Sequence, residues 1–237
     1  MTLAVGGLAR VPFPNGDSMT AHFTVDPNRF LDEHASRLVA AYFGGLDQSR
    51  YTGRMFERLA GGGDHEDRRD RFDATDLVAV TMLGVDVAAE TAIWILGEGG
   101  AQLTDLLNQI PADVSLSEAP EALIADDSPA VELWQTLQRL PDIAWVKAGK
   151  LCARKRPHLL PVYDKVVNAA LHAPAAFWLS LHSWMQERSN VDRLNEVRDE
   201  AGIGNDISLL RIFDVAIWMR CHGMQNVAAL SDVPPPS

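Results

Sequence analysis

Residues 140–167 read LPDIAWVKAGKLCARKRPHLLPVYDKVV, and the order of structural signals in this stretch decides the expected fold. One helix ends near Leu140, a tight turn follows, and a second helix is predicted from about Trp145 to Lys155. An extended Pro-Val-Tyr segment then leads to Asp164, a residue type preferred at helix N-caps. The stretch therefore predicts two helices joined by a hairpin, followed by an aspartate at the start of a third helix.

Helical periodicity continues through most of the chain. After Ser128-Pro129, which is a typical helix start, apolar residues recur at Ala130, Leu133 and Leu137. The alternation of Val, Ile, Thr and Tyr that marks strands is scarce. The sequence predicts an all-α fold.

The length of 237 residues is enough to bury a substantial core without disulfides or metals. We expect an N-terminal extension over 1–25, one two-lobed helical domain over 26–230, and a disordered, proline-rich tail over 231–237. The stretch 111–128 is acidic and interrupted by prolines. The lobes are expected to meet near 111–128 and 164–172.

The composition limits the classes of partner. A net charge of -11 argues against strong non-specific binding to nucleic acid, although it leaves room for a local basic stripe. The two cysteines, Cys152 and Cys221, lie in helical stretches and suggest no disulfide, which fits the reducing cytoplasm. Neither a signal peptide nor an apolar run of about 20 residues is present, so a cytoplasmic protein without membrane contact is expected.

The quoted stretch resembles the core of the helix-hairpin-helix DNA glycosylase superfamily. The motif of that superfamily is Leu-Pro-Gly-Val-Gly, a variable residue, a lysine or its replacement, Thr-Ala, and later Pro-Val-Asp before a helix. When Ala148 is aligned with the alanine of Thr-Ala, Asp164 falls on the catalytic aspartate without a gap. Val146 falls on the lysine position, since 164 − 146 = 18 is the family's lysine-to-aspartate spacing.

The resemblance extends more weakly over most of 73–223. Residues 77–84 are similar to the buried early helix of the superfamily, and residues 212–223 are similar to its closing helix. The resemblance implies a two-lobed helical bundle of the helix-hairpin-helix glycosylase type. Separately, residues 51–56 and 76–80 resemble a family of uncharacterised bacterial proteins, which implies no activity.

The superfamily resemblance also implies a chemistry. Asp164 would stabilise the oxocarbenium-like sugar as a nucleobase leaves, or activate a water, with the nucleotide flipped into a cleft between the lobes. Val146 cannot act as a nucleophile, so any enzyme would be a monofunctional N-glycosylase. The iron–sulfur cysteines of some members are missing, and we expect neither cofactor nor metal.

The hairpin departs from the superfamily motif. It reads Asp142-Ile143-Ala144, so both glycines that allow close approach to a DNA phosphate are absent, and Asp142 would repel that phosphate. Cations follow on the next helix, with Lys147, Lys150 and Arg154 at i, i+3 and i+7. They form either a basic stripe that binds phosphate or ordinary surface charges. Surface cations near the C-terminus of the helix would interact favourably with the helix dipole. The candidate nucleic-acid-binding residues are Ile143, Ala144, Trp145, Lys147, Lys150, Arg154 and Arg156.

Three functions stay open on these grounds. The first is N-glycosidic cleavage of a nucleobase by a DNA-glycosylase-like protein, with Asp164 as the catalytic residue. The second is a non-catalytic binding or interaction protein that retains the fold, in which Asp164 is simply a helix N-cap. The third is an N-glycosidase for a free nucleoside. DNA or a nucleoside is thus the candidate partner, and the sequence leaves the oligomeric state open.

Overall fold

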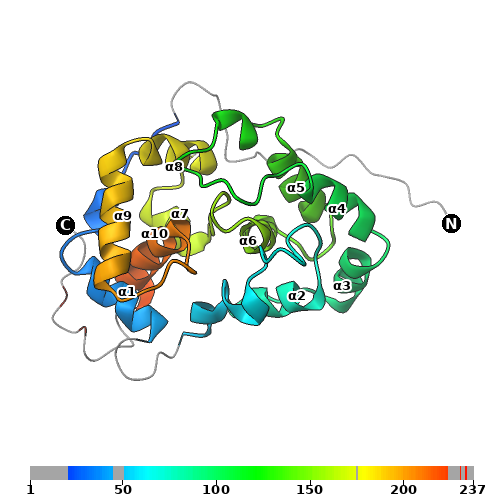
Figure 1. Ribbon diagram of the computed structural model, residues 1–237, viewed down its shortest axis with the longest axis horizontal. Coiled ribbons are helices and arrows are strands. Elements are labelled where there is room, and N and C mark those ends of the chain that lie inside the picture. The colour runs from blue at the N-terminus through cyan, green and yellow to red at the C-terminus, as the bar shows by residue number, and fades with distance from the viewer. Residues whose placement is uncertain (1–20, 45–50, 175, 224–229, 231–232, 234–237) are drawn as a thin grey trace.

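A computed structural model describes residues 21–44, 51–174, 176–223, 230 and 233 (Figure 1). These residues form helices and turns, with no strand among them, which confirms the all-α prediction. Residues 1–20 of the expected N-terminal extension, and 231–232 and 234–237 of the expected tail, lie outside the described residues. No helix in the described ranges is long and apolar enough to cross a membrane.

Ten α-helices run through the described part of the chain. They are α1 (Ala35–Phe43), α2 (Ala74–Thr81), α3 (Ala89–Leu96), α4 (Gly100–Leu107), α5 (Pro129–Gln138), α6 (Trp145–Lys155), α7 (Lys165–Ala170), α8 (Phe177–Met185), α9 (Arg188–Glu200) and α10 (Leu209–Trp218). Short 3-10 turns lie at η1 (Pro27–Phe30), η2 (Thr52–Met55), η3 (Leu59–Gly61) and η4 (Glu121–Leu123), and a π turn, η5 (Met219–Gly223), follows α10. The helix predicted from about Trp145 to Lys155 is confirmed as α6.

The helices pack in two groups. In one group α6 packs against α2 and α5, and α4 packs against α3 and α5; in the other, α10 packs against α1, α7 and α9. Figure 1 shows the first group on the right, the second on the left and α6 near the middle, seen almost end-on. The buried apolar side chains of both groups form one continuous cluster.

Local capping chemistry sets several helix starts. The Ser128 hydroxyl accepts a hydrogen bond from the amide of Val131 at 3.2 Å, and Pro129 follows at the first helical position. Asp73 caps α2 in a capping box that Asp76 completes. The start predicted at Ser128-Pro129 is confirmed as the start of α5.

A buried ionic cluster, formed by Asp76, Arg154 and Lys155, joins α2 to the end of α6. The Asp76 carboxylate pairs with Arg154 Nε at 3.1 Å and with Lys155 Nζ at 2.9 Å. All three side chains are 0% exposed. Arg154 also donates to the carbonyl oxygens of Phe56 and Leu59, and Gly63 allows this approach because a Cβ at residue 63 would collide with Arg154.

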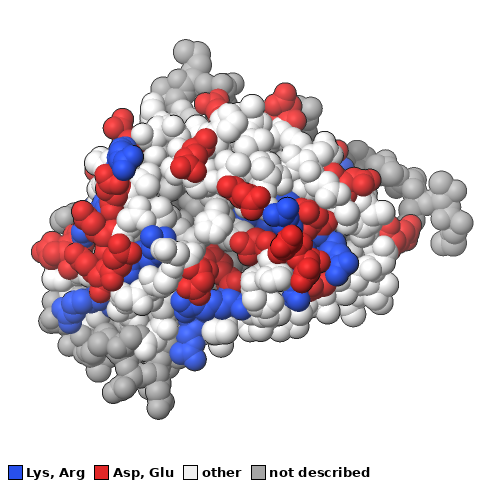
Figure 2. All heavy atoms as spheres, viewed as in Figure 1, with Lys and Arg blue, Asp and Glu red and all other residues white. Residues whose placement is uncertain are grey.

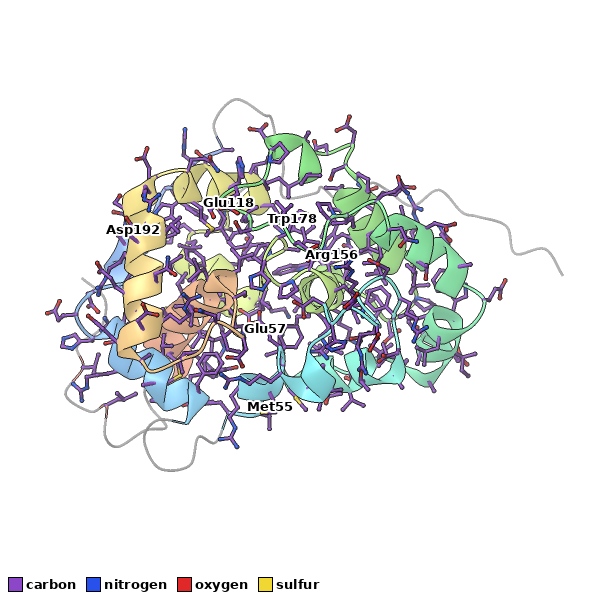
Figure 3. The ribbon with its side chains drawn as sticks, viewed as in Figure 1. Met55, Glu57, Glu118, Arg156, Trp178 and Asp192 are labelled. Atoms are coloured by element: carbon purple, nitrogen blue, oxygen red, sulfur yellow. The ribbon has the colours of Figure 1, made fainter. Side chains whose placement is uncertain are left out.

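Arg156, the residue after α6, is also buried, with 1% exposure (Figure 3). Its guanidinium donates to the carbonyl oxygens of Leu107 at 2.6 Å and Ile110 at 2.8 Å, and to the Asp70 carboxylate at 2.6 Å. The last carbonyl groups of a helix carry a partial negative charge, so a cation at the end of α4 is favourable. Arg156 therefore ties α6 to the C-terminal end of α4.

Glu57 ties the segment between η2 and η3 to α10. Its carboxylate accepts hydrogen bonds from the Ser208 amide at 2.8 Å and the Ser208 hydroxyl at 2.7 Å. Burial raises the pKa of Glu57 to about 7, and the two hydrogen bonds oppose this rise. The contact holds the start of α10 next to the chain that precedes α2.

The substitution Asp76→Asn is expected to destabilise the fold by about 3 to 5 kcal/mol, because it leaves two buried cations without their carboxylate. Urea denaturation followed by circular dichroism measures the change. Asp105→Asn, on the exposed face of α4, is the matched control and is expected to change stability by less than about 0.5 kcal/mol. Equal stability of the two variants would contradict the structural role of the cluster.

Candidate functional site

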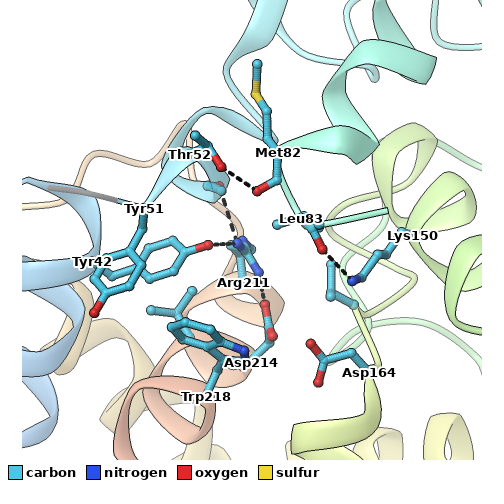
Figure 4. Close-up of a pocket in the computed structure, with 14 residues that line it drawn as sticks. Tyr42, Tyr51, Thr52, Met82, Leu83, Lys150, Asp164, Arg211, Asp214 and Trp218 are labelled. Carbon is cyan, nitrogen blue, oxygen red and sulfur yellow. Dashed lines mark hydrogen bonds and ion pairs between the residues drawn. The ribbon is translucent and has the colours of Figure 1, made fainter. Parts of the chain in front are cut away.

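A cavity of about 280 Å³ lies where the two helix groups meet (Figure 4). Residues of α1, η2 and α10 line one side, and the other is lined by the turn after α2, by α6 and by the residues that lead into α7. Four charged side chains line it: Lys150, Asp164, Arg211 and Asp214. The volume is at the lower end of the range for small-molecule sites.

The two carboxylate oxygens of Asp164 have different surroundings. Oδ1 accepts hydrogen bonds from the amides of Val166 at 2.9 Å and Val167 at 3.1 Å, so Asp164 is the N-cap of α7, as predicted. Oδ2 has no hydrogen-bond partner within the described ranges. Figure 4 shows the carboxylate directed into the cavity, which leaves one oxygen for a ligand.

Tyr163 fixes the backbone that carries Asp164. Its ring stacks on Phe177 of α8 at a centroid distance of 3.8 Å and an interplanar angle of 5°. Its hydroxyl donates to the Asn168 side chain of α7. Burial raises the pKa of Tyr163, so the hydroxyl stays neutral. The residue before Asp164 is thereby held by two helices at once.

Arg211 and Asp214 form a buried ion pair on the opposite wall. Both lie on α10, and their side chains are each 3% exposed. Arg211 also donates to the Tyr42 hydroxyl and to the Gly53 carbonyl oxygen, the latter at 3.3 Å. Burial raises the pKa of Asp214 to about 6, while the Arg211 guanidinium opposes this rise. The pair is therefore fixed in position before any ligand binds.

Gly53 allows this wall to pack closely. A Cβ at residue 53 would collide with the Tyr42 hydroxyl and would come within 3.0 Å of the Arg211 guanidinium. The neighbouring Thr52 hydroxyl donates to the Met82 carbonyl oxygen at 2.9 Å. This hydrogen bond joins η2 to the turn after α2, so the chain on either side of the cavity is tied together at its rim.

Three aromatic rings form one side of the cavity. Tyr42 and Tyr51 stack at a centroid distance of 5.1 Å and an angle of 7°. Trp218 meets both rings edge-on, at 6.0 Å from Tyr42 and 5.5 Å from Tyr51. An aromatic wall of this kind suits a flat, polarisable ligand.

Lys150 enters the cavity from α6. The residue is 4% exposed, and its ammonium donates to the Leu83 carbonyl oxygen at 2.8 Å. Burial lowers the pKa of Lys150, and the nearby carboxylates of Asp164 and Asp214 oppose this shift. Figure 4 shows Lys150 and Asp164 on the same side of the cavity, across from the Arg211–Asp214 pair.

Comparison with known protein families matches residues 35–221 to the family described as "Family of unknown function (DUF6308)". The chain belongs to this family. Its membership agrees with the predicted resemblance to a family of uncharacterised proteins. No curated protein and no solved structure matches the chain.

The negative charge of Asp142 in the hairpin is balanced by contacts inside the protein. The Asp142 carboxylate accepts hydrogen bonds from the Ala88 amide at 2.8 Å and from the Thr91 hydroxyl, and it pairs with Lys147 at 3.2 Å. Partial burial raises the pKa of Asp142, but these contacts outweigh it and hold the pKa below its usual range. Asp142 thus links the hairpin to the start of α3.

The two alternatives for the cations of α6, a basic stripe for phosphate and ordinary surface charges, both place them at the surface, which is wrong for Lys150 and Arg154. Lys150 is 4% exposed, and Arg154 and Arg156 are 1% exposed. The reason is that α6 packs against both α2 and α5, so its cations meet carbonyl groups and carboxylates inside the protein. Lys147, which is part-buried, pairs with Asp142.

The predicted hairpin residues have diverse surroundings. Ile143 is 3% exposed and belongs to the core, whereas Ala144 is exposed as the N-cap of α6. Trp145 is part-buried against Tyr163, at a centroid distance of 5.2 Å. Of the predicted site residues, Asp164 and Lys150 share the cavity, and the other six do not line it.

The opposite wall was not predicted as a site. Arg211 and Asp214 are charged residues three positions apart in an otherwise apolar helix, a pattern that indicates a buried pair. Tyr42 and Tyr51 carry no comparable signal, because they reach the cavity only through the packing of α1 and η2. In the described part of the chain, no group of three or more His, Cys, Asp or Glu side chains could hold a metal ion.

The substitution Asp142→Asn tests whether the charge of the Asp142 carboxylate stabilises the hairpin. Because the pKa of Asp142 is depressed in the folded chain, its ionised form stabilises the fold above its unfolded pKa of about 3.9, and this contribution is lost as the pH falls through the folded value. We expect a loss of about 1 to 2 kcal/mol at pH 7 that shrinks below about pH 4. Urea denaturation at several pH values measures it.

Asp86→Asn is the control, since Asp86 is exposed and its side chain makes no hydrogen bond or ion pair with the described residues. Its stability is expected to follow that of the wild type at every pH. A loss at Asp142 that stays the same down to pH 3 would mean that the carboxylate charge is not what stabilises the hairpin.

Proposed function

We propose that this chain cleaves the N-glycosidic bond of a nucleobase-containing substrate, with Asp164 as the catalytic carboxylate. The observation that carries the proposal is the second oxygen of Asp164, which faces the cavity without a partner among the described residues. A purely structural N-cap needs no cavity beside it. The resemblance of residues 140–167 to the helix-hairpin-helix glycosylases supports the same assignment, and with it a two-lobed bundle of that type.

The chemistry follows from the charge that develops during cleavage. As the bond between C1′ and the base nitrogen breaks, the sugar becomes an oxocarbenium-like cation. A carboxylate already fixed by two backbone amides stabilises this cation without reorganising. It also accepts a proton from the water that attacks C1′. No lysine stands at position 146, which supports hydrolysis without a covalent enzyme–sugar intermediate at that position.

The aromatic wall fits the base. Stacking of a nucleobase on aromatic side chains contributes about 1 to 3 kcal/mol to binding and depends little on the identity of the base. Tyr51 and Trp218 line the same cavity as Asp164. A base held against these rings would bring its glycosidic bond toward the carboxylate, so that binding and cleavage use opposite ends of one site.

Charge favours a free nucleoside over duplex DNA as the substrate. Arg154 and Arg156 are directed into the interior, and Lys147 is paired with Asp142. Figure 2 shows acidic side chains gathered over α9 on the face that it displays. A duplex is held mainly by cations that contact its phosphates. A nucleoside has no phosphate group, so its binding does not require such cations.

The decisive variant is Asp164→Asn. Asparagine is as good an N-cap as aspartate, so α7 should keep its start while the negative charge is lost. We expect hydrolysis to fall by at least about 10²-fold with little change in thermal stability. Ribonucleosides, deoxyribonucleosides and duplexes that contain uracil or hypoxanthine are the substrates to compare, with release of the base measured by chromatography.

Asp26→Asn is the matched control, because Asp26 is also an N-cap aspartate but lies outside the cavity. It should retain wild-type turnover. If Asp164→Asn releases base as fast as the control does, Asp164 is not catalytic. Saturable binding of nucleosides with no turnover by the wild type would favour the non-catalytic binding protein.

A further inference from the structure

Lys150 faces the cavity with unused donors. An ammonium has three N–H groups, and one of them donates to the Leu83 carbonyl oxygen at 2.8 Å. No carboxylate oxygen within the described ranges lies within 4.0 Å of its Nζ. Asp164 and Asp214 are nevertheless close enough to influence its pKa. Opposite charges therefore line one small cavity without touching, and a ligand between them would contact both.

One hydrogen bond to a carbonyl group does not offset the cost of burying the Lys150 ammonium. Removing an ammonium from water is unfavourable unless its donors are satisfied. Arg154, one turn further along α6, has its buried charge matched by Asp76 and two carbonyl groups. Lys150 makes one hydrogen bond and directs its charge toward the cavity. The two remaining donors suit the acceptor atoms of a bound molecule.

A proton donor of this kind accelerates N-glycosidic cleavage. The sugar becomes positive and is stabilised by Asp164, while the departing base takes the bonding electron pair and becomes negative. Ring nitrogens and carbonyl oxygens of nucleobases accept protons at this stage. Resting on the proposed function, we propose that Lys150 is a second catalytic residue, which protonates the leaving nucleobase while Asp164 stabilises the sugar.

The reaction balances as a hydrolysis. The bond between C1′ and the base nitrogen breaks, its electron pair goes to the base, and the base takes a proton from Lys150 Nζ. A water oxygen bonds to C1′, and the water gives its proton to the Asp164 carboxylate. That proton returns to the neutral Lys150 amine, so both residues recover their initial state. The products are the free base and the sugar with a hydroxyl group at C1′, and nothing is oxidised or reduced.

Burial supports this role because it lowers the pKa of Lys150. An ordinary lysine, with a pKa near 10.4, releases its proton reluctantly at neutral pH. A desolvated ammonium gives up a proton more readily, which brings it closer to the requirement for a general acid. Arg211, the other cation of the cavity, keeps its proton and is already paired with Asp214.

The test compares two kinds of leaving group. Nucleosides need a proton on the departing base, whereas a 4-nitrophenyl ribofuranoside releases an anion that is stable without one. We expect Lys150→Gln to lower kcat/KM for nucleosides by about 10²-fold or more, and for the 4-nitrophenyl glycoside by less than about 5-fold. Asp164→Asn should lower both, because the sugar is the same.

Two further variants make the result specific. Lys150→Arg retains a charged donor that cannot release its proton, so it should lose nucleoside hydrolysis as the glutamine variant does. It also supplies the test if the glutamine variant does not fold. Lys165→Gln removes an exposed lysine beside Asp164 and should leave both rates unchanged.

The outcomes separate the two proposals. If the wild type hydrolyses both substrates and Lys150→Gln slows them equally, or slows neither, the protonating role of Lys150 is wrong while the proposed function survives. If the wild type hydrolyses neither substrate, the proposed function fails and the role of Lys150 fails with it. Selective loss of nucleoside hydrolysis supports both.

Discussion

The buried cluster of Asp76, Arg154 and Lys155 is the interaction on which the rest of the molecule depends. It joins the first turn of α2 to the last turn of α6 with side chains that are 0% exposed. Three buried charges stabilise a fold only when their geometry and hydrogen bonds are complete, and here carbonyl groups from the preceding segment complete them. The position of α6 is therefore fixed by a contact that tolerates little displacement.

The cavity follows from that constraint. Since the end of α6 is held at the start of α2, the lysine one turn earlier reaches the end of α2 and donates to Leu83. The two helices are thus joined at two places, one at each end of α2. The segment after α6 then leads through Tyr163, stacked on α8, to Asp164. Helix α6 therefore positions Lys150 directly, and it positions Asp164 through the segment that follows the helix.

Sequence patterns predicted the local structure of α6 and of the start of α7, but they did not predict that the cations of α6 are buried. Periodicity and capping signals were sufficient for α6 and for Asp164 as an N-cap, because both depend on neighbouring residues. The spacing of Lys150 and Arg154 predicted a shared helical face, but it could not tell whether that face meets water or protein. Burial depends on α2 and α5, whose packing is not encoded within the motif. The contribution of α1 and α10 to the cavity is non-local for the same reason.

The proposed hydrolysis requires that a nucleobase binds in the cavity with its glycosidic bond beside Asp164. A crystal structure of the Asp164→Asn variant with a bound nucleoside tests it most directly. We expect the base to lie against Tyr51 and Trp218, C1′ to lie next to the side chain of residue 164, and a base acceptor atom to lie within hydrogen-bond distance of Lys150. A nucleoside bound outside the cavity, or bound with its sugar turned away from residue 164, would contradict it.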